Sequence, residues 1–377
     1  MKEGLDIAGL SLPFAAGLTI GELVFIPLLL KNPGNVTVYH AAAASLCLTA
    51  VYLCFLSLKK TRAFFLYAGL FFSLGFLCSL NTGIAGGAKK ENSLIKTAER
   101  SAERMKSIIE ALPYESEETA AVVKALTTGD RGGLGRETAG IFRKAGGAHL
   151  LALSGLHLGI IYLLLLWATA VLGRSPAARA LRFLLICGIS GYYTIATGRS
   201  PSLIRAFYFI IINEGAKLFS RKQTIIRSLC SALFFQLATE PAIIRNTGFQ
   251  LSYLAMAGIA TLYPILSSWY PSEGKADRFN LTLKLWKMTA LTISCQVFTA
   301  PLVWFKFGTF PKYFLITNIT AVPLTSIVMF SSIALIAASA LGIPSGLLLR
   351  INEASVQSLL KLLELISAAA GAESGMD

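Results

Sequence analysis

Two of the chain's three histidines, His149 and His157, flank Ser154 at the start of a strongly apolar stretch, residues 146–166. If one helix spans both histidines, their imidazoles lie within about 80° of each other on its surface. Gly146-Gly147 at its start and Ser154-Gly155 within it indicate a helix that begins or breaks at a membrane interface. Ionisable groups at such positions are functional by default. The alternative, that Ser154 and His157 only hydrogen-bond a neighbouring helix, stays open.

A serine beside a histidine also raises the hypothesis of an intramembrane serine protease. A nucleophile and its base need aligned approach, usually from separate elements. Ser154 and His157 are one turn apart on a single predicted helix, so this hypothesis is the weakest of those considered.

A second set of polar residues lies in later apolar stretches. Arg199 precedes Pro201, and Arg205 follows about a turn and a half deeper in the same stretch. A charge at mid-membrane costs about 2.5–3.5 kcal/mol on insertion scales, so these groups must face water or one another. A salt bridge from Arg205 to an acidic residue is the alternative to a functional role. Acidic and amide residues in predicted spans include Glu22, Asn213, Glu214, Glu240, Gln250, Gln296 and Asn318.

Several kinds of chemistry find no support in the motifs. The sequence has no GxxxxGK[ST] phosphate loop, and its three histidines form no HxH or HExxH pattern. Its six cysteines lie in apolar runs without a CxxC pair and are typical of small core residues. We therefore expect no metal, no other cofactor and no enzymatic activity.

The composition is that of a polytopic membrane protein. The chain is 54% hydrophobic and only 14% charged, with a mean hydropathy of +0.63, whereas soluble domains carry about 25% charged residues. Apolar runs of about 20 residues, the length that crosses a bilayer, recur throughout. We predict an all-α bundle of about 10–11 transmembrane helices, with spans near 7–30, 38–58, 63–80, 150–172, 183–198, 203–219, 228–244, 249–266, 288–304, 314–342 and, less clearly, 346–370.

The distribution of Lys and Arg predicts the orientation. With the N-terminus in the cytoplasm, the inner loops hold 15 basic residues and the short outer loops five, as the positive-inside rule requires. The first apolar run is too long for a cleaved signal peptide. We therefore expect a multi-pass protein of the bacterial inner, cytoplasmic membrane with residues 81–145 outside.

The expected organisation has four parts. N-terminal transmembrane helices fill 1–80, and 81–145 is an extracytoplasmic segment, nearly balanced at 11 basic and 9 acidic residues. Its periodicity predicts a helix from Leu94 to Pro113, a second from Ser116 to Leu126, and a short third over 136–145. The main bundle is 146–345, and 346–377 is an amphipathic or transmembrane helix with polar residues on one face, namely Arg350, Glu353, Gln357, Lys361 and Glu364.

Several motifs resemble those of one family. HLLALSGLHLG, His149 to Gly159, resembles the signature of the competence domain of ComEC proteins, the membrane channel for DNA uptake in natural transformation. The order of the other segments agrees, and the resemblance covers about 120–342. These segments are LTTGDRGGL (126–134), GRSPSLIRAF (198–207), GFQLSYLAMAGI (248–259), TAPLVWFKFGTFP (299–311) and VPL (322–324) after Asn318.

The resemblance implies a channel that carries single-stranded DNA into the cytoplasm. It also implies a cytoplasmic helicase or strand-binding motor and an extracytoplasmic DNA receptor as partners, besides the lipid bilayer, with a homodimer left open. Larger members carry an OB-like domain and a metallo-β-lactamase-like nuclease domain. Here 81–145 is too short and too helical for the former, and the chain ends at Asp377 without the latter, so we do not expect nuclease activity.

The expected roles of single residues follow from the same resemblance. Candidates for the DNA path are Arg131, Ser154, His157, Arg199, Arg205, Gln250 and Asn318, and further residues of the family motifs are Gly129, Asp130, His149, Gly155, Pro301 and Pro323. A secondary transporter for a small anionic solute is the main alternative, although no internal repeat of the kind found in transporters is evident.

Overall fold

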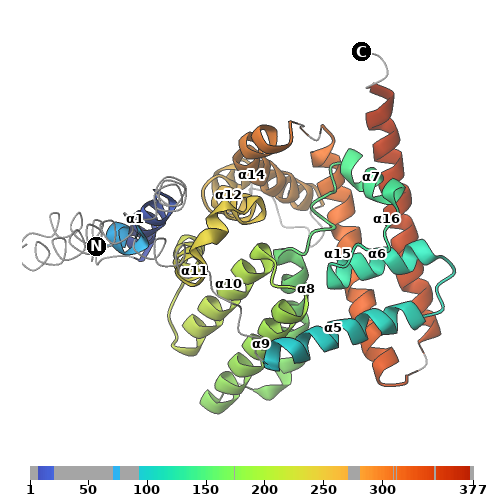
Figure 1. The fold of residues 1–377 in the computed structure, drawn as a ribbon, viewed down its shortest axis with the longest axis horizontal. Coiled ribbons are helices and arrows are strands. Elements are labelled where there is room, and N and C mark those ends of the chain that lie inside the picture. The colour runs from blue at the N-terminus through green and yellow to red at the C-terminus, as the bar shows by residue number, and fades with distance from the viewer. Residues whose placement is uncertain are drawn as a thin grey trace, which may run out of the picture. The chain divides into compact units, whose positions relative to one another are not determined.

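The computed structural model describes an all-α protein, with helices joined by turns and without strands in the part described (Figure 1). This confirms the predicted fold class. The predicted span 38–58 and most of 63–80 fall outside the residues that the structure describes, which are 7–20, 71–76, 93–173, 175–270, 281–308, 310, 312–343 and 345–373.

The chain forms two compact units, and their boundaries fall inside two helices, α10 (Pro201–Leu218) and α12 (Thr247–Thr261). The first unit comprises Met1–Lys90 and Tyr208–Ala257, and the second comprises Glu91–Phe207 and Gly258–Asp377.

The first unit is organised around the pairing of α1 (Ile7–Ile20) with α11 (Ile225–Thr239). The short 3-10 helix η4 (Pro241–Arg245) follows α11 and leads into α12. Side chains from these elements form one apolar cluster, whose buried members are Phe14, Leu18, Leu237, Ile243 and Phe249.

Two glycines bring α1 against the helical segment 71–76 in the same unit. A Cβ atom on Gly17 would lie 1.8 Å from the carbonyl oxygen of Phe72, and one on Gly75 would lie 2.0 Å from that of Phe14. Neither position has room for a side chain, so the two backbones touch. Small residues permit this close approach between helices of membrane proteins.

The second unit contains most of the helices. In chain order they are α5 (Ser93–Ala111), α6 (Glu117–Thr128), α7 (Arg136–Lys144), α8 (Gly155–Ala168), η3 (Thr169–Leu172), α9 (Pro176–Ala196), α13 (Tyr263–Ser268), α14 (Leu281–Phe307), α15 (Phe314–Ala340) and α16 (Gly346–Glu373).

The three helices predicted in the 81–145 segment are confirmed, and local sequence explains their ends. Helix α5 ends two residues before Pro113, because proline cannot continue a helix. Ser116 caps α6 by accepting a hydrogen bond from the Glu118 N–H at 3.2 Å. Gly129 ends α6 in the left-handed conformation, with φ of 78°.

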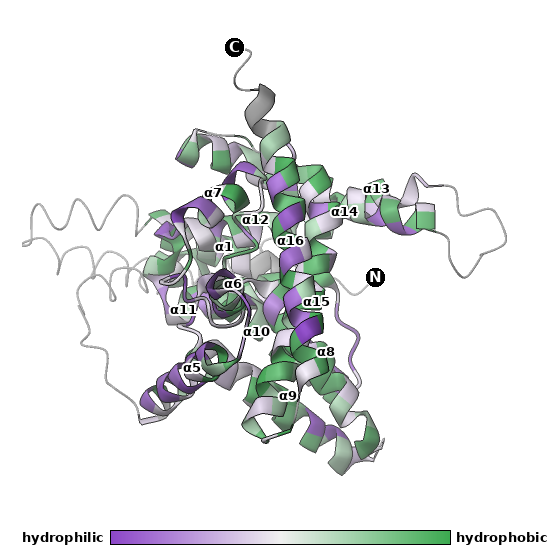
Figure 2. Cartoon of the chain, turned by 90° about the vertical axis from the view of Figure 1, so that its right-hand side faces the viewer, coloured by the Kyte–Doolittle hydropathy of each residue, from purple (hydrophilic) through white to green (hydrophobic). Residues whose placement is uncertain are grey.

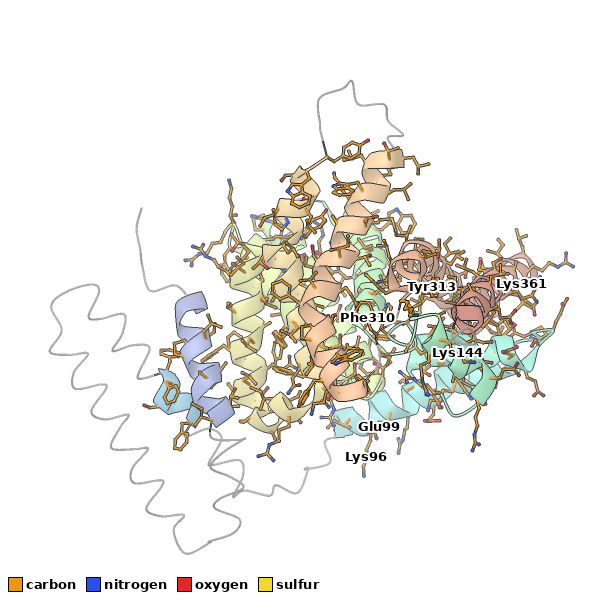
Figure 3. All side chains as sticks on the ribbon, turned by 90° about the horizontal axis from the view of Figure 1, so that it is seen from above. Lys96, Glu99, Lys144, Phe310, Tyr313 and Lys361 are labelled. Atoms are coloured by element: carbon orange, nitrogen blue, oxygen red, sulfur yellow. The ribbon has the colours of Figure 1, made fainter. Side chains whose placement is uncertain are left out.

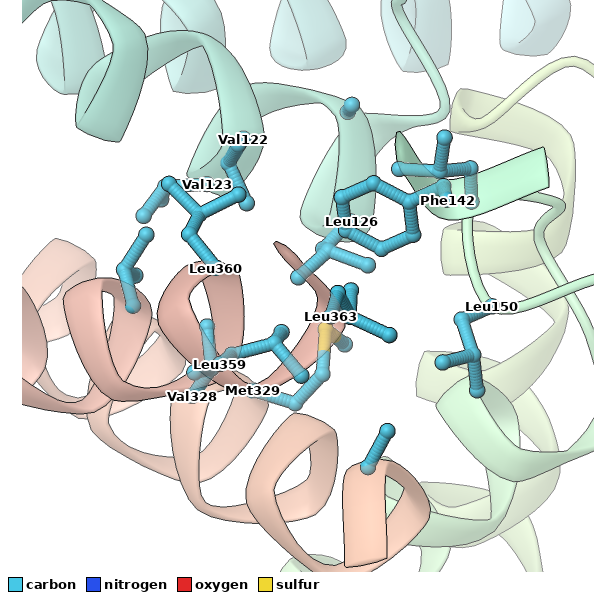
Figure 4. Packing of buried hydrophobic residues seen from close by; sticks show 14 of the residues in the cluster. Val122, Val123, Leu126, Phe142, Leu150, Val328, Met329, Leu359, Leu360 and Leu363 are labelled. Atoms are coloured by element: carbon cyan, nitrogen blue, oxygen red, sulfur yellow. The ribbon is translucent and has the colours of Figure 1, made fainter. Parts of the chain in front are cut away.

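Helices α6, α7, α15 and α16 share one apolar core (Figure 4). Val123 and Leu126 of α6 and Phe142 of α7 pack with Met329 of α15 and Leu363 of α16 in this cluster. Figure 1 shows α5 and α6 running across α15, and residue contacts join both helices to it. Residues 93–144 therefore pack on the core of the second unit through their buried apolar side chains. Their placement outside the membrane stays a prediction.

Helices α15 and α16 form an antiparallel hairpin. The Tyr313 hydroxyl, at the start of α15, donates to the Ala369 carbonyl near the end of α16 at 3.5 Å. The Asn352 amide, near the start of α16, donates to the Ser331 and Ser332 hydroxyls at 2.9 and 2.8 Å. The two helices are thus in contact along most of their length.

The C-terminal helix is amphipathic, which is one of the two alternatives predicted for residues 346–377. Val356, Leu359 and Leu363 are buried against the core, whereas Arg350, Gln357, Lys361 and Glu364 are exposed. The predicted polar face differs at Glu353, which is 8% exposed and accepts a hydrogen bond from the Glu115 N–H at 2.8 Å.

In the part of the chain described, four helices are long and apolar enough to cross a membrane, namely Gly155–Leu172, Thr247–Ser268, Leu281–Phe307 and Phe314–Ala340. Two shorter apolar helices are Ser11–Ile20 and Ile225–Thr239. The predicted spans 183–198 and 203–219 are also helical, as α9 and α10, but these helices are more polar. The chain is an integral membrane protein.

Candidate functional site

The turns between α7 and α8, residues 145–154, are held by side chains from three distant segments of the second unit. The Arg131 Nε donates to the Leu151 carbonyl at 3.2 Å. The Ser200 hydroxyl, just before α10, donates to the Leu153 carbonyl at 3.1 Å. The Thr317 hydroxyl of α15 donates to the Ala145 carbonyl. We call residues 145–154 the junction loop, because segments far apart in the sequence meet on it.

Helix α8 begins at Gly155, later than the predicted span at 150, and Ser154 is its N-cap. The Ser154 hydroxyl accepts from the Leu156 N–H at 3.2 Å, and the His157 Nδ1 accepts from the Ser154 N–H at 3.2 Å. This is a capping box in which histidine takes the place usually held by Glu or Gln. The prediction that His149 and His157 share a helical face is wrong, because His149 lies in the turns before the cap.

The contact between Ser154 and His157 is part of the cap of α8. The Ser154 Oγ lies 3.1 Å from the His157 Nδ1, but both groups are also engaged in the cap. His157 is 1% exposed, and its Nε2 has no hydrogen-bond partner among the described residues. A triad needs a third group on that second nitrogen, to orient the ring and stabilise its charged form. Capping accounts for the contact.

Arg205 lies against the first turn of α8. A Cβ atom on Gly155 would lie 3.2 Å from the Arg205 Nη2 and 3.6 Å from the Ala206 Cβ, so the glycine makes room for the guanidinium. Arg205 is 8% exposed. Glu214, one of its predicted partners, is in the first unit and pairs with Lys217 at 2.6 Å. The motif at the start of α10 thus meets the motif at the start of α8.

The Gly-Asp-Arg turn after α6 is built by its own side chains. The Asp130 Oδ1 accepts from the Gly132 N–H at 2.9 Å, and its Oδ2 lies 3.0 Å from the Lys106 Nζ of α5. These two contacts lower the pKa of Asp130 below its ordinary value. Gly129 faces the Leu153 side chain, 2.5 Å from where a Cβ would lie, so the turn packs directly on the junction loop.

The link between α9 and α10 has two consecutive residues with positive φ, Gly198 at 84° and Arg199 at 55°. A left-handed conformation is uncommon for a residue with a side chain. Here the Arg199 N–H donates to the Thr194 carbonyl at 3.0 Å and closes the end of α9. The Arg199 side chain is exposed, as is that of Arg131 among the other predicted path residues.

The structure places the remaining predicted residues as follows. His149 faces the Asn318 side chain of α15 and the Gly146 backbone. Pro301 and Pro323 lie within α14 and α15 and are exposed. Gln250 belongs to the first unit, where its Nε2 donates to the Ile244 carbonyl at 2.7 Å.

A family model described as "Competence protein" matches residues 126–376. This range includes the contacts of the junction loop described above, but not Lys106 of α5, which pairs with Asp130. The chain belongs to the competence protein family. It is similar to ComE operon protein 3 of Bacillus subtilis (strain 168), with 27% identity over 202 residues that cover 54% of this chain and 24% of that protein. The match thus spans about a quarter of that relative's length. No solved structure matches.

Within the family region, sequence reasoning missed the residues that tie the helices together. Ser200 and Thr317 are among them, and so is Tyr193, whose hydroxyl donates to the Thr127 carbonyl at 2.8 Å. Asn352 is another, and like Thr317 it is 0% exposed. A signal for it exists, because Asn352 is the polar member of an apolar face that continues with Val356, Leu359 and Leu363.

Proposed function

We propose that this chain forms the path by which single-stranded DNA crosses the bacterial cytoplasmic membrane during competence. Family membership supports a role in DNA uptake. The single observation that carries the proposal is the convergence, inside the matched region, of the Gly-Asp-Arg turn, the junction loop and the starts of α8 and α10. Segments separated by up to about 75 residues meet there in an apolar bundle.

The electrostatics of this convergence favour an anion. The N-terminus of a helix carries partial positive charge on its first amides. The Arg205 guanidinium adjoins that end of α8. Arg199 lies two residues before Pro201, the first residue of α10. Cations beside a helix N-terminus suit a phosphate, which is the group a nucleic acid presents whatever its sequence.

We propose two roles for the predicted path residues on the basis of their contacts. Ser154, His157 and Arg131 bind backbone groups of α8 and the junction loop, so we assign them to positioning. Arg199 and Arg205 are assigned to contact with the strand. Gln250 binds a backbone carbonyl in the first unit and is assigned to positioning as well.

The work of translocation must come from elsewhere in this proposal. With the cell interior negative, each phosphate that enters costs about 2.3 kcal/mol per 100 mV. The sequence has no phosphate-loop motif with which to hydrolyse ATP. We therefore propose a cytoplasmic helicase or strand-binding motor that pulls the strand, an outer receptor that delivers it, and a chain that acts as a conduit and not as an enzyme. The N-terminus and the basic inner loops face the cytoplasm in this scheme.

The test is DNA uptake in a transformable strain that lacks its own family member and carries this chain. We expect uptake of labelled DNA to be restored. Arg205→Ala should reduce it at least about tenfold, and Arg205→Lys should recover part of the loss, because a phosphate contact depends on charge. Arg104→Ala, which removes an exposed arginine from α5, serves as the matched control. Membrane insertion of each variant is confirmed by fractionation.

Two results would count against the proposal. Failure of the unsubstituted, correctly inserted chain to restore uptake would contradict the function. Restored uptake with both Arg205 variants at the parental level would remove Arg205 from the strand path and leave the function in place.

A further inference from the structure

Helix α7 presents three cations on one side. Arg136 and Arg143 are seven residues apart, so they lie within about 20° of each other around the helix, and Lys144 lies about 80° from Arg136. All three side chains are exposed, and none of them forms an ion pair or a hydrogen bond with another described residue. We call Arg136, Arg143 and Lys144 the α7 basic face.

The α7 basic face is anchored from behind and open in front. On the opposite side of the helix Phe142 is 0% exposed and belongs to the core that includes Leu126 and Leu363, so α7 cannot rotate to withdraw its cations. On the outer side a Cβ atom on Gly140 would meet no atom within 4 Å. In Figure 2 α7 carries both hydrophilic and hydrophobic residues, and Figure 3 labels Lys144 at its end.

The carboxylates nearby in the sequence do not neutralise this face. Asp130 pairs with Lys106 at 3.0 Å, and Glu110 pairs with Lys124 at 2.8 Å. Glu137 is the one carboxylate of α7 itself, and it lies about 100° from the first arginine, at the edge of the face. Although the segment is nearly balanced in its totals, its ion pairs therefore leave net positive charge on α7.

The stability of the helix accounts for only part of the face. Arg143 and Lys144 are in the last turn of α7, where the helix dipole favours cations. Arg136 is the first residue of the helix, where the same dipole disfavours a cation. An anionic ligand along the face accounts for all three positions.

The surroundings of the face favour a polyanion in water over a lipid surface. A helix that binds a membrane surface inserts apolar side chains, but no large apolar side chain is exposed among the described residues from 93 to 162. A second copy of the chain docked through the same face would bring like charges together. With no exposed aromatic ring for a base to stack on, the face suits phosphates alone, which carry no sequence information.

The face leads directly to the proposed site. The junction loop begins one residue after α7 ends, and the Arg131 side chain ties that loop to the turn before α7 through the Leu151 carbonyl. Arg136 and Arg143 are about 10 Å apart along the helix axis, whereas successive phosphates of a B-form strand rise by about 3.4 Å. The face is therefore long enough to meet more than one phosphate.

We propose that the α7 basic face binds the phosphate backbone of the DNA beside the junction loop, by charge and without reading bases. This inference rests on the proposed function, because the choice of DNA among polyanions comes from it. It adds a surface to that function, since Arg199 and Arg205 are not part of the face.

The test is the affinity of the full-length chain for DNA in nanodiscs of phosphatidylcholine, measured by fluorescence anisotropy of a labelled single strand at several salt concentrations. The double variant Arg136→Gln/Arg143→Gln should bind at least about tenfold more weakly at low salt, and equally so for strands of different sequence. The slope of log affinity against log salt should fall by about 1.4, because each phosphate contact of a single strand contributes about 0.7. Arg136→Lys/Arg143→Lys should keep most of the affinity.

The matched control removes the same charge from α5. Arg100→Gln/Arg104→Gln replaces two exposed arginines that line a shallow depression together with Glu99 and Glu103. We expect this variant to bind DNA within about twofold of the parent chain, because carboxylates flank its arginines. Size-exclusion elution at the parental volume confirms that each variant is folded.

Three results would overturn the inference. The first is parental affinity and salt slope in the glutamine variant of α7. The second is an equal loss in the α5 control, which would assign the effect to net charge. The third is co-flotation of the nanodiscs with phosphatidylglycerol vesicles that depends on the α7 arginines while DNA affinity does not, which would assign the face to lipid.

Failure of this inference can be told apart from failure of the proposed function. Restored DNA uptake together with unchanged binding by the glutamine variant of α7 overturns the inference and leaves the function in place. No uptake by the correctly inserted parent chain, together with DNA binding that depends on the α7 arginines, overturns the function and supports the face as a DNA-binding surface.

Discussion

Replacing Asn352 by leucine tests how α16 is attached to the rest of the second unit. The Asn352 amide group donates to the Val328 carbonyl at 3.3 Å as well as to Ser331 and Ser332. Its Oδ1 accepts from the Tyr114 hydroxyl at 2.9 Å. One fully buried side chain thus joins α16, α15 and the link between α5 and α6.

The expected loss of stability follows from these contacts. Leucine leaves the half-buried Tyr114 hydroxyl without its acceptor, which costs about 1–3 kcal/mol, and each lost hydrogen bond adds about 0.5–1.5 kcal/mol. The serines keep backbone acceptors, because Ser332 also donates to the Val328 carbonyl at 2.6 Å. Hydrogen bonds between membrane helices average nearer 0.6 kcal/mol. We therefore expect a loss of about 2–4 kcal/mol in the free energy of unfolding.

The assay is unfolding of the detergent-solubilised chain, followed by tryptophan fluorescence, with Gln357→Leu as the control on the exposed face of the same helix. Tyr114→Phe should cost about 1 kcal/mol. The double variant should lose less than the sum, because the two side chains share one bond. A change below about 0.5 kcal/mol for Asn352→Leu, or strict additivity with Tyr114→Phe, would refute the proposed attachment.

Two further predictions concern packing and pH. Gly258→Ala should lower the yield of folded protein several-fold in a size-exclusion assay, because the new Cβ would lie 2.1 Å from the Ser294 carbonyl oxygen. Gly159→Ala should be tolerated, because no atom lies within 4 Å of its Cβ. Equal yields of the two variants would contradict this packing. The pKa of Asp130 is lowered, first by the Gly132 backbone amide and then by Lys106. The Asp130 carboxylate should therefore stabilise the folded chain above the unfolded pKa of about 3.9. This contribution should be lost as the pH falls through the lower pKa of the folded state. Asp130→Asn should therefore flatten the acid limb of the stability profile, and an unchanged limb would contradict the assignment.

Local features of the 81–145 segment could be predicted from the sequence because the interactions behind them are local. Pro113 ends one helix and Ser116 caps the next, each through groups within a few residues. Gly129 ends α6 in a left-handed conformation that glycine adopts without strain. These signals need no knowledge of the rest of the fold.

The start of α8 could not be predicted in the same way. Residues 149–153 are apolar enough to continue a helix, but the Ser154 and His157 side chains compete for the backbone groups at that point and stop it. Neither the Arg205 contact with Gly155 nor the Ser200 bond to Leu153 has a local signal. The sequence motifs identified the candidate site residues, but they did not predict which of these residues are in contact in the folded chain.

The sequence by itself determined that this is a helical membrane protein of the competence family, because hydropathy, charge placement and motif order are properties of the chain. Only the tertiary structure decided that α16 lies along α15, with Leu359 and Leu363 buried and Gln357 and Lys361 exposed. An amphipathic helix must bury its apolar face, but periodicity does not say against which partner. That choice rests on contacts such as Tyr114 with Asn352, which are 238 residues apart and exist only once the helices have packed.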